Sequence, residues 1–278
     1  MPKKPNQTPV TVIGAGLAGC EATFQLIRRG IRVRLYEMRL RVPTGAHRTD
    51  LFGELVCSNS LGSNLPDRAS GLLKEEMRAL NSYIMDTAYK YRVPAGQALA
   101  CDRDAFAREI TRYLRGHSLV EFINEEVVEF PQEGMVILAT GPLTTKPLMD
   151  HLVKLFGTDQ MFFFDAIAPV VKLSTVDMTQ AFKADRYGEE GKGDYINCPM
   201  NKEEYQTFVQ ELLKAEKIPL PGFEKTARKT LFTACQPVEE IAASGPESLR
   251  FGPLKPVGLT DPRTKKGCFA ILQVRLDN

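Results

Sequence analysis

A glycine-rich turn close to the first residues constrains the fold of this chain more than any other feature. It has the form Gly14-x-Gly16-x-x-Gly19 and directly follows the apolar run Val10–Ile13, which predicts a short buried strand. In such a turn, the first glycine permits a tight bend, the second lets backbone amides approach a pyrophosphate, and the third lets helix and strand pack closely. The pattern therefore predicts dinucleotide binding at the N-terminus of a helix, where phosphate charge is stabilised.

The sequence after the turn completes a β-α-β unit. A helical stripe of apolar residues ends at Gly30, and apolar residues then alternate with arginines over 31–35, which predicts a strand with one face in solvent. Glu37 ends that strand, where a carboxylate can accept hydrogen bonds from both hydroxyls of a ribose. Because strand, helix and acidic residue all stand in the expected order, a dinucleotide is the expected ligand, with Ala15 and the three glycines of the turn around it.

A second segment bears on which dinucleotide binds. The continuous apolar run Met135–Ala139 predicts a buried strand, and Thr140 and Gly141 follow it. This run resembles the "ATG" element of flavoproteins that bind two dinucleotides, in which a later strand returns beside the nucleotide. The simpler interpretation is a buried strand that ends in a turn. Together with the glycine-rich turn, the segment favours FAD over NAD and adds Thr140 and Gly141 to the expected cofactor contacts.

Charge and hydropathy exclude some classes of function. The chain has 278 residues, 43% of them hydrophobic and 25% charged, as in ordinary soluble globular proteins. Its 36 basic and 34 acidic residues leave a net charge of only +2, so an RNA partner would need a local positive surface. Residues 1–10 are polar and do not suggest a signal peptide, and no apolar run approaches the roughly 20 residues of a membrane span. We therefore expect a cytoplasmic protein without a membrane partner.

The cysteines do not form a metal site or a disulfide framework by their spacing. None of them forms a C-x-x-C motif, and no cluster of histidine and cysteine has zinc-ligand spacing, so no bound metal is expected. A chain of this size and class is typical of a reducing cytosol, where thiols stay free to react. The six are Cys20, Cys57, Cys101, Cys198, Cys235 and Cys268.

Further patterns predict the other elements. The segment 39–70, rich in Gly, Ser, Asn and Asp, is expected to be a long functional loop. Leu73, Met77, Leu80 and Ile84 predict one helix, and Asp102 and Asn201 are expected to cap two more. Beyond about residue 156, the run 161–171 is aromatic and β-rich, and prolines become frequent.

These elements predict an α/β fold with a Rossmann-type FAD-binding domain and an inserted α+β domain. The expected divisions are residues 1–155 for the FAD-binding domain, 156–255 for the inserted substrate domain, and 256–278 for the start of a segment that returns to the FAD domain.

The sequence resembles a known family, the bacterial folate- and FAD-dependent tRNA (uracil-C5-)-methyltransferases. The similarity runs through essentially the whole chain and is more specific than a general Rossmann similarity. It is carried by Val12–Gly19, Glu54–Leu61, Gly71–Arg78, Val93–Gly96, Asp102–Arg103, Asp165–Pro169, Tyr195–Tyr205 and Leu249–Leu259.

The resemblance implies a reaction and its cofactors. In that family, reduced FAD takes a one-carbon unit from 5,10-methylenetetrahydrofolate and passes it to C5 of a uracil in RNA, most often in the T-loop of tRNA. NAD(P)H reduces the flavin. The two functional cysteines of the family correspond to Cys235, expected to be the nucleophile toward uracil, and Cys57, expected to lie near the flavin as an acid/base or a guard of its reactive face. Without the resemblance, each would be interpreted as a buried small apolar residue.

The chain also departs from the family pattern. Family members are considerably longer, Thr233 replaces a carboxylate two residues before Cys235, and Gly62 stands where the family has an arginine. Three alternatives therefore stay open: a flavin oxidoreductase that uses NAD(P)H, an RNA-binding fragment without catalysis, and a paralogue that acts on ribosomal RNA. The oligomeric state and the modified uridine stay open as well.

Overall fold

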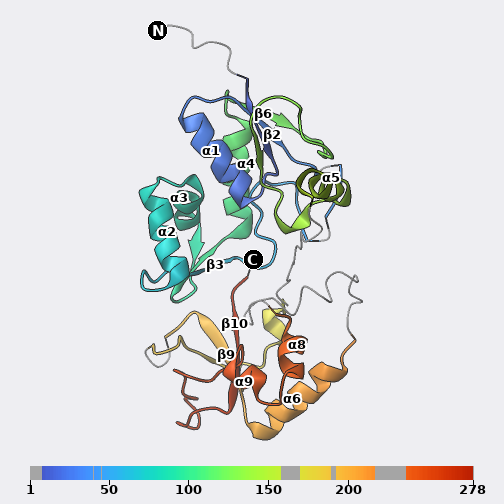
Figure 1. Ribbon diagram of the computed structural model, residues 1–278. Helices are drawn as coiled ribbons and strands as arrows, with labels where there is room; N and C mark the ends of the chain where they lie inside the picture. The colour runs from blue at the N-terminus through green and yellow to red at the C-terminus, as the bar shows by residue number, and fades with distance from the viewer. Residues whose placement is uncertain are drawn as a thin grey trace. The chain divides into compact units, whose positions relative to one another are not determined.

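The computed structural model describes residues 8–39, 41–44, 46–157, 170–188, 192–216 and 236–277. The chain divides into two compact units. The first comprises residues 1–93, 97–167 and 278, and the second comprises 94–96 and 168–277 (Figure 1). Each unit has its own sheets and its own buried clusters of apolar side chains.

The first unit is built on a four-stranded parallel sheet with the order β6-β2-β1-β7. Its strands are β1 (Val10–Ile13), β2 (Val33–Tyr36), β6 (Val120–Ile123) and β7 (Val136–Leu138). The chain moves outward from β1 to β2 and β6 and then returns to the other side of β1, which is the order of a dinucleotide-binding half. The predicted α/β, Rossmann-type fold class is confirmed.

Helices cover both faces of this sheet because neighbouring residues of a strand point to opposite sides. Val12 packs into the large cluster to which α1 (Leu17–Arg28) and α4 (Arg103–Arg115) contribute, whereas Ile13 packs against Leu148 and Leu152 of α5 (Lys146–Phe156). Figure 1 shows α5 on the opposite side of the sheet from α1 and α4. Each fully buried aliphatic side chain contributes about 1.5–3 kcal/mol.

A small antiparallel sheet, with the order β3-β5-β4, extends the first unit. It consists of β3 (Ser60–Ser63), β4 (Arg92–Val93) and β5 (Ala98–Cys101), and it lies with the helices α2 (Ala69–Ala79) and α3 (Tyr83–Lys90). The segment 39–70, expected to be a loop, therefore contains a strand.

The single helix predicted from Leu73, Met77, Leu80 and Ile84 is wrong. The helix is interrupted between α2 and α3. There, Asn81 has a φ of 57°, and the Ser82 side chain accepts a hydrogen bond from the Met85 amide. Asparagine tolerates the left-handed region, and serine is a preferred N-cap, so these local preferences prevail over the apolar periodicity. As a result, Leu73 and Leu80 are 55% and 72% exposed.

The second unit contains a three-stranded antiparallel sheet, β10-β9-β8, next to short helices. Its elements are β8 (Phe182–Lys183), β9 (Tyr195–Met200), α6 (Lys202–Lys214), α8 (Val238–Ala243), α9 (Ser248–Phe251) and β10 (Ala270–Arg275). The buried Tyr205 of α6 lies in its main apolar cluster. The predicted cap Asn201 forms a reciprocal capping box with Glu204. Of the predicted β-rich run 161–171, residues 161–169 lie outside the described residues.

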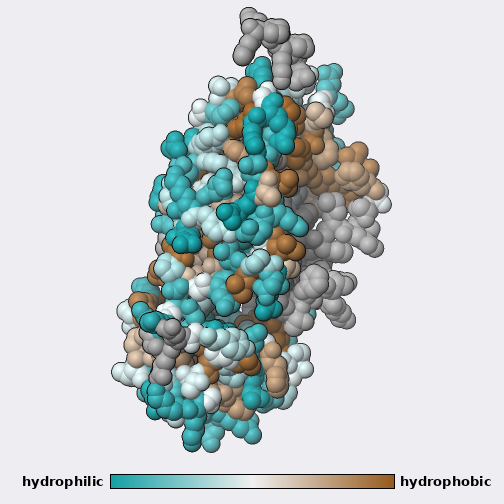
Figure 2. All heavy atoms as spheres, turned by 90° about the vertical axis from the view of Figure 1, so that its left-hand side faces the viewer, coloured by the Kyte–Doolittle hydropathy of each residue, from teal (hydrophilic) through white to brown (hydrophobic). Residues whose placement is uncertain are grey.

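The described residues expose both polar and apolar side chains. On the side shown in Figure 2, hydrophilic residues predominate and hydrophobic ones gather in small groups. Within the described ranges, no helix is both long enough and apolar enough to cross a bilayer.

The cap of α4 allows a quantitative test. The Asp102 carboxylate accepts a hydrogen bond of 2.9 Å from the Ala105 amide, as the sequence predicted. Asp102→Ala should lower the free energy of unfolding by about 0.5–2 kcal/mol, because one amide of the first turn loses its acceptor. Urea unfolding followed by circular dichroism measures this loss. Asp150→Ala, which removes only an exposed pair with Lys146, is the matched control and should cost about 0.5 kcal/mol or less. Equal losses in the two variants would contradict the capping role.

Candidate functional site

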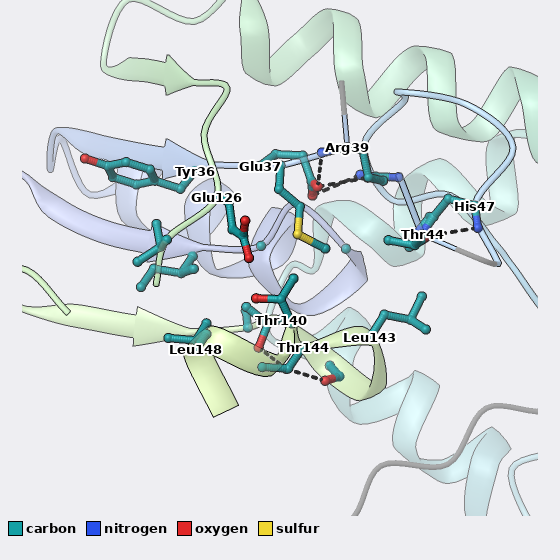
Figure 3. Close-up of a pocket in the computed structure, with 18 of the residues that line it drawn as sticks. Tyr36, Glu37, Arg39, Thr44, His47, Glu126, Thr140, Leu143, Thr144 and Leu148 are labelled. Carbon is teal, nitrogen blue, oxygen red and sulfur yellow. Dashed lines mark hydrogen bonds and ion pairs between the residues drawn. The ribbon is translucent and has the colours of Figure 1, made fainter. Parts of the chain in front are cut away.

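A pocket of about 280 Å³ opens at the carboxyl ends of the parallel strands of the first unit (Figure 3). Ligands of doubly wound sheets bind at this edge, outside the point where the strand order reverses. Residues from the ends of β1, β2 and β7 and from the segment after β6 line it. Five of the residues predicted from the sequence are among them: Gly14, Gly16, Glu37, Thr140 and Gly141.

Two glycines of the turn are required by close packing. Gly14 has a φ of 100°, and a Cβ placed on it would lie 2.5 Å from the carbonyl oxygen of Ala139. A Cβ on Gly19 would lie only 1.8 Å from the carbonyl oxygen of Gly14. No side chain larger than hydrogen fits at either position without a backbone shift. These contacts bring the first turn of α1 against the ends of β1 and β7.

Gly16 has a different role. A Cβ on this residue would meet no atom within 4 Å, and Gly16 lines the pocket. Gly16 is also the N-cap of α1, and no side chain caps that helix among the described residues. Because the first amides of a helix have no acceptor within the helix, they form a ready site for an anion. The pocket therefore offers backbone donors where a bound phosphate could approach closely.

Glu37 holds a fixed carboxylate at the wall of the pocket. Its Oε2 accepts hydrogen bonds from the Ala15 amide at 2.9 Å and from Arg39 Nη2 at 3.2 Å, and its Oε1 accepts one from the Arg39 amide at 3.1 Å. Burial raises the pKa of Glu37, but the Arg39 guanidinium and these hydrogen bonds outweigh burial, so the pKa lies below its ordinary value. Glu37 is thus an ionised acceptor at neutral pH.

Arg39 is a site residue that the sequence did not reveal. It is 8% exposed, lines the pocket and pairs with Glu37, with 3.1 Å between Nε and Oε1. Its Nη1 lies 3.7 Å from Oε2 of Glu54. In the described part of the chain, neither Nε nor Nη1 has an acceptor in hydrogen-bond geometry. An arginine two residues after a predicted strand is ordinarily taken as a solvated surface residue, so the sequence carried no signal for its burial.

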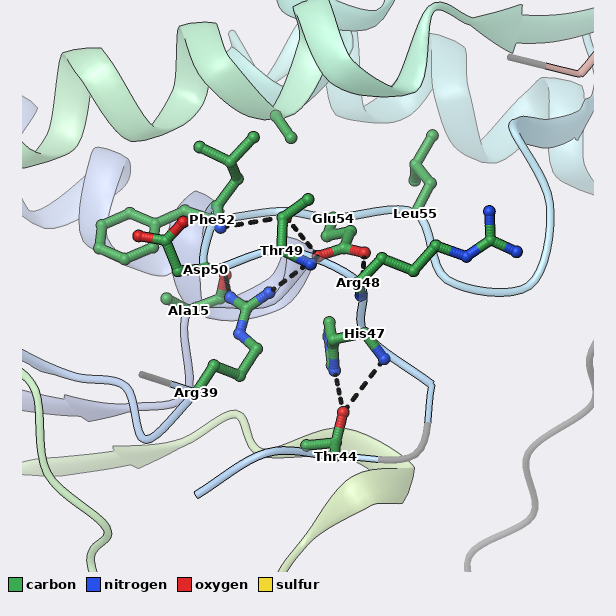
Figure 4. A network of polar contacts seen from close by, with 12 residues as sticks. Ala15, Arg39, Thr44, His47, Arg48, Thr49, Asp50, Phe52, Glu54 and Leu55 are labelled. Atoms are coloured by element: carbon green, nitrogen blue, oxygen red, sulfur yellow. Dashed lines mark hydrogen bonds and ion pairs between the residues drawn. The ribbon is translucent and has the colours of Figure 1, made fainter. Parts of the chain in front are cut away.

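The segment after Arg39 forms a polar network beside the turn (Figure 4). Glu54 accepts hydrogen bonds from the Arg48 amide at 2.7 Å and from the amide and hydroxyl of Thr49 at 3.1 and 2.6 Å. The Thr44 hydroxyl contacts His47 Nδ1 at 2.7 Å. Thr44, His47 and Glu54 all line the pocket, so part of the segment expected to be a long functional loop is an ordered wall of the site.

The opposite wall is formed after β7 and β6. The hydroxyls of Thr140 and Thr144 lie 2.6 Å apart, and Thr144 donates to the carbonyl oxygen of Gly141 at 2.8 Å. These contacts hold the 3₁₀ turn Gly141–Leu143 at the pocket, with Leu148 of α5 behind it (Figure 3). Glu126 lines the same wall.

The cysteines differ in their surroundings. Cys57 is exposed and adjoins Val56, which lines the pocket. Cys20 and Cys101 are buried. Burial raises the pKa of the half-buried Cys198 and Cys268 thiols. The predicted nucleophile Cys235 lies outside the described residues.

Two arginines of the second unit are engaged in contacts within that unit. Arg250 donates to the Phe269 carbonyl oxygen at 2.9 Å and lies over the Phe269 ring. Arg263 makes a two-point contact with Asp261 at 3.1 and 2.8 Å. Lys255 and Lys266 are exposed.

The donor set of the pocket fits a dinucleotide. Uncapped helix amides suit a pyrophosphate, an open Cα face at Gly16 permits close approach, and a buried ionised carboxylate suits a ribose diol. The pocket also has apolar walls, including Leu17, Val56 and Leu148, that suit planar rings.

Comparison with known proteins agrees with this arrangement. Residues 9–276 match the family model described as "Glucose inhibited division protein A". The chain is 52% identical over 269 residues to the methylenetetrahydrofolate–tRNA-(uracil-5-)-methyltransferase TrmFO of Fusobacterium nucleatum, covering 97% of this chain and 61% of that protein. The protein of the same name from Acetivibrio thermocellus is 53% identical over the same shares of both chains. The chain thus spans about three fifths of the length of these relatives.

A solved structure of Aquifex aeolicus GidA shows a more distant similarity. It is 18% identical, with a TM-score of 0.39, and the match covers 48% of this chain and 25% of that one.

The packing of the turn predicts unequal effects of two alanines. Gly19→Ala should lower the free energy of unfolding by more than about 3 kcal/mol, because its Cβ overlaps the Gly14 carbonyl. Gly16→Ala should cost about 1 kcal/mol or less, since its Cβ enters open space. Urea unfolding of both variants decides the point. Similar losses would show that the helix does not pack as described.

The buried Glu37–Arg39 pair predicts a pH dependence. Because the pKa of Glu37 is lower in the folded state than its ordinary value of 4.5, ionised Glu37 stabilises the fold above pH 4.5. This contribution is lost as the pH falls through 4.5 toward the folded-state pKa. Glu37→Gln leaves the buried Arg39 with only the more distant carboxylate of Glu54 and should cost about 3 kcal/mol at pH 7.

Urea unfolding measured from pH 7 to pH 3 should show the difference between the original chain and Glu37→Gln narrowing with acid. Glu121→Gln, which removes an exposed partner of Arg34, serves as the control and should show a small, flat difference. A gap for Glu37→Gln that stays constant below pH 4.5 would disprove the assignment.

Proposed function

The chain belongs to the family described as glucose inhibited division protein A, and we propose that it binds FAD and takes part in folate-dependent methylation of uracil C5 in tRNA. The observation that carries the proposal is the pocket of the first unit, whose donors and open glycine suit a dinucleotide. The relatives whose names state this methyltransferase activity are about half identical to the chain over 97% of its length.

Each part of the pocket has a role in this proposal. The N-terminal amides of α1 bind the pyrophosphate, and Gly16 allows its close approach. Glu37 accepts hydrogen bonds from the ribose hydroxyls, and Ala15 fixes the Glu37 carboxylate. Thr140 and Gly141 form the wall beside the flavin half. When bound, FAD supplies the redox chemistry that turns a methylene group from 5,10-methylenetetrahydrofolate into a methyl group, with NAD(P)H as the source of electrons.

Cys235 is proposed as the nucleophile toward the RNA base. Uracil C5 is a poor nucleophile, and a thiolate that adds to C6 converts the ring to an enolate whose C5 can attack an electrophilic carbon. After the new bond forms at C5, a base removes the C5 proton and the transferred carbon separates from its carrier as an exocyclic methylene; a hydride, whose electrons come from NAD(P)H, then adds to that carbon, and the Cys235 thiolate leaves C6 as the uracil ring is restored. The thiolate is the reactive form, so a positive neighbour would favour the reaction by lowering the thiol pKa.

Cys57 is proposed to act at the flavin side of the site. Its neighbour Val56 lines the pocket, and the Cys57 side chain is exposed. A thiol there can exchange a proton with the reacting carbon or shield the reactive face of the cofactor. We likewise propose that the chain acts on RNA and uses folate and NAD(P)H.

A two-part experiment tests the proposal. The purified chain mixed with FAD should retain a flavin absorbance band after gel filtration, whereas Gly16→Val should lose it, because its side chain occupies the approach of the pyrophosphate. A T-loop RNA hairpin carrying 5-fluorouridine should then form a covalent adduct in the presence of methylenetetrahydrofolate and NADPH, because fluorine at C5 blocks release of the cysteine. Cys235→Ala should bind FAD and form no adduct.

Cys198→Ala is the matched cysteine control and should form the adduct. Retained flavin with NADPH turnover but no RNA adduct would instead favour a flavin oxidoreductase. Retained RNA binding without any flavin band would favour an RNA-binding protein, and either outcome contradicts the proposal.

A further inference from the structure

Ala15 of the glycine-rich turn forms hydrogen bonds through both its amide and its carbonyl oxygen. The Ala15 amide donates to Glu37 Oε2 at 2.9 Å, toward the site proposed for the ribose. The Ala15 carbonyl oxygen accepts from the Gly53 amide at 2.8 Å and from Arg39 Nη2 at 3.4 Å. The turn is therefore linked both to the nucleotide-binding acid and to the segment that leads to Cys57.

That segment is held at intervals along its length. The Phe52 amide donates to the Thr111 hydroxyl at 2.7 Å, and the Leu55 carbonyl oxygen accepts from Arg103 Nη1 at 2.9 Å. The Asn59 carbonyl oxygen accepts from the Cys101 amide at 2.9 Å. The exposed Cys57 lies in the short stretch between the attachments at Leu55 and Asn59, so a small movement of residues 53–55 would change its position.

Arg39 can form ion pairs with two acidic residues, Glu37 and Glu54. The Arg39 side chain is 3% exposed, and those of Glu37 and Glu54 are 9% and 10% exposed. Its guanidinium contacts Glu37 closely but stays 3.7 Å from Glu54, and within the described residues its Nε and Nη1 have no acceptor in hydrogen-bond geometry (Figure 4). A buried guanidinium with unused donors gains stability from any better acceptor that it can reach.

We propose that Arg39 is a positioning residue that couples dinucleotide binding at the turn to the position of Cys57, with Glu54 as the link. The inference rests on the proposed function, because the coupled ligand is FAD. The proposed function uses the glycine-rich turn and two cysteines, and it gives no role to Arg39 or Glu54.

The coupling follows from the limited acceptor capacity of Glu37. Three hydrogen bonds already reach its two oxygens, and a carboxylate has about four acceptor positions. Ribose hydroxyls that donate to Glu37 compete with Arg39, and the released guanidinium donors turn toward Glu54. Glu54 in turn holds the Arg48 and Thr49 amides. A stronger Arg39–Glu54 pair therefore fixes the segment that precedes Cys57 and lowers the access of reagents to its thiol.

The test measures the reactivity of Cys57 and needs no turnover. The chain is given short pulses of iodoacetamide with and without saturating FAD, and alkylation of the peptide that contains Cys57 is quantified by mass spectrometry. In the original chain, FAD should slow alkylation of Cys57 by about fivefold or more, the range of ordinary coupling between two sites.

Two variants separate coupling from direct shielding. In Arg39→Lys and in Glu54→Gln, FAD at concentrations readjusted to saturation should leave the alkylation rate within about twofold of the rate without FAD, because the link is broken. Glu54→Gln keeps the size of the side chain and serves if Arg39→Lys does not fold. Arg34→Lys, on β2 but paired at the surface with Glu121, is the matched control and should keep full protection.

Protection that persists in Arg39→Lys and Glu54→Gln would overturn the inference, since FAD would then cover Cys57 directly. Equal rates with and without FAD in the original chain would overturn it too. If no flavin band is retained by the chain, the proposed function fails and the inference fails with it. A retained band with unchanged protection in both variants removes this inference alone.

Discussion

The contact between Gly19 and Gly14 is the constraint on which the site in the first unit depends. Because the two residues lie so close, α1 begins directly at the carboxyl end of β1. Gly14 also packs closely against Ala139, which follows β7, so the end of a second strand lies beside the start of the helix. The helix then presents its unbonded amides where two parallel strands end. The position of the helix N-terminus at the pocket follows from this packing, since no charged side chain is needed to place the helix dipole at the opening.

Beside the glycine-rich turn, the site contains a group of buried charges: Glu37, Arg39 and Glu54. Glu37 is ionised because Arg39 and two backbone amides compensate its loss of water. Arg39 lies against two carboxylates, and the segment that carries Glu54 is ordered around it. Removing one member of such a group is costly because the remaining charges stay in a poorly solvated place. A short network beside the turn thus joins the wall of the pocket to the segment that leads to Cys57.

Local signals in the sequence were sufficient for the main features. The caps Asp102 and Asn201 depend on neighbours within a few residues, and the glycine spacing and Glu37 stand within one β-α-β unit, so their patterns predicted the observed elements. The break at Asn81 was missed because an apolar stripe continues across it, although both Asn81 and Ser82 favour a turn. Arg39 and Glu54 could not be predicted, because their meeting depends on a fold that brings residues 15, 39 and 54 together. The family resemblance, in contrast, indicates the expected chemistry from the sequence alone.

The surroundings of Cys20 have a consequence for resistance to oxidants. Its thiol donates to the Ala15 carbonyl oxygen at 3.3 Å and is fully buried, and burial raises its pKa far above neutrality. Peroxide attacks thiolates and needs access to the sulfur, so of these two cysteines the exposed Cys57 should be oxidised before the buried Cys20. Oxidation of Cys57 would therefore leave the sulfur beneath the glycine-rich turn, and with it the packing of that turn, unchanged.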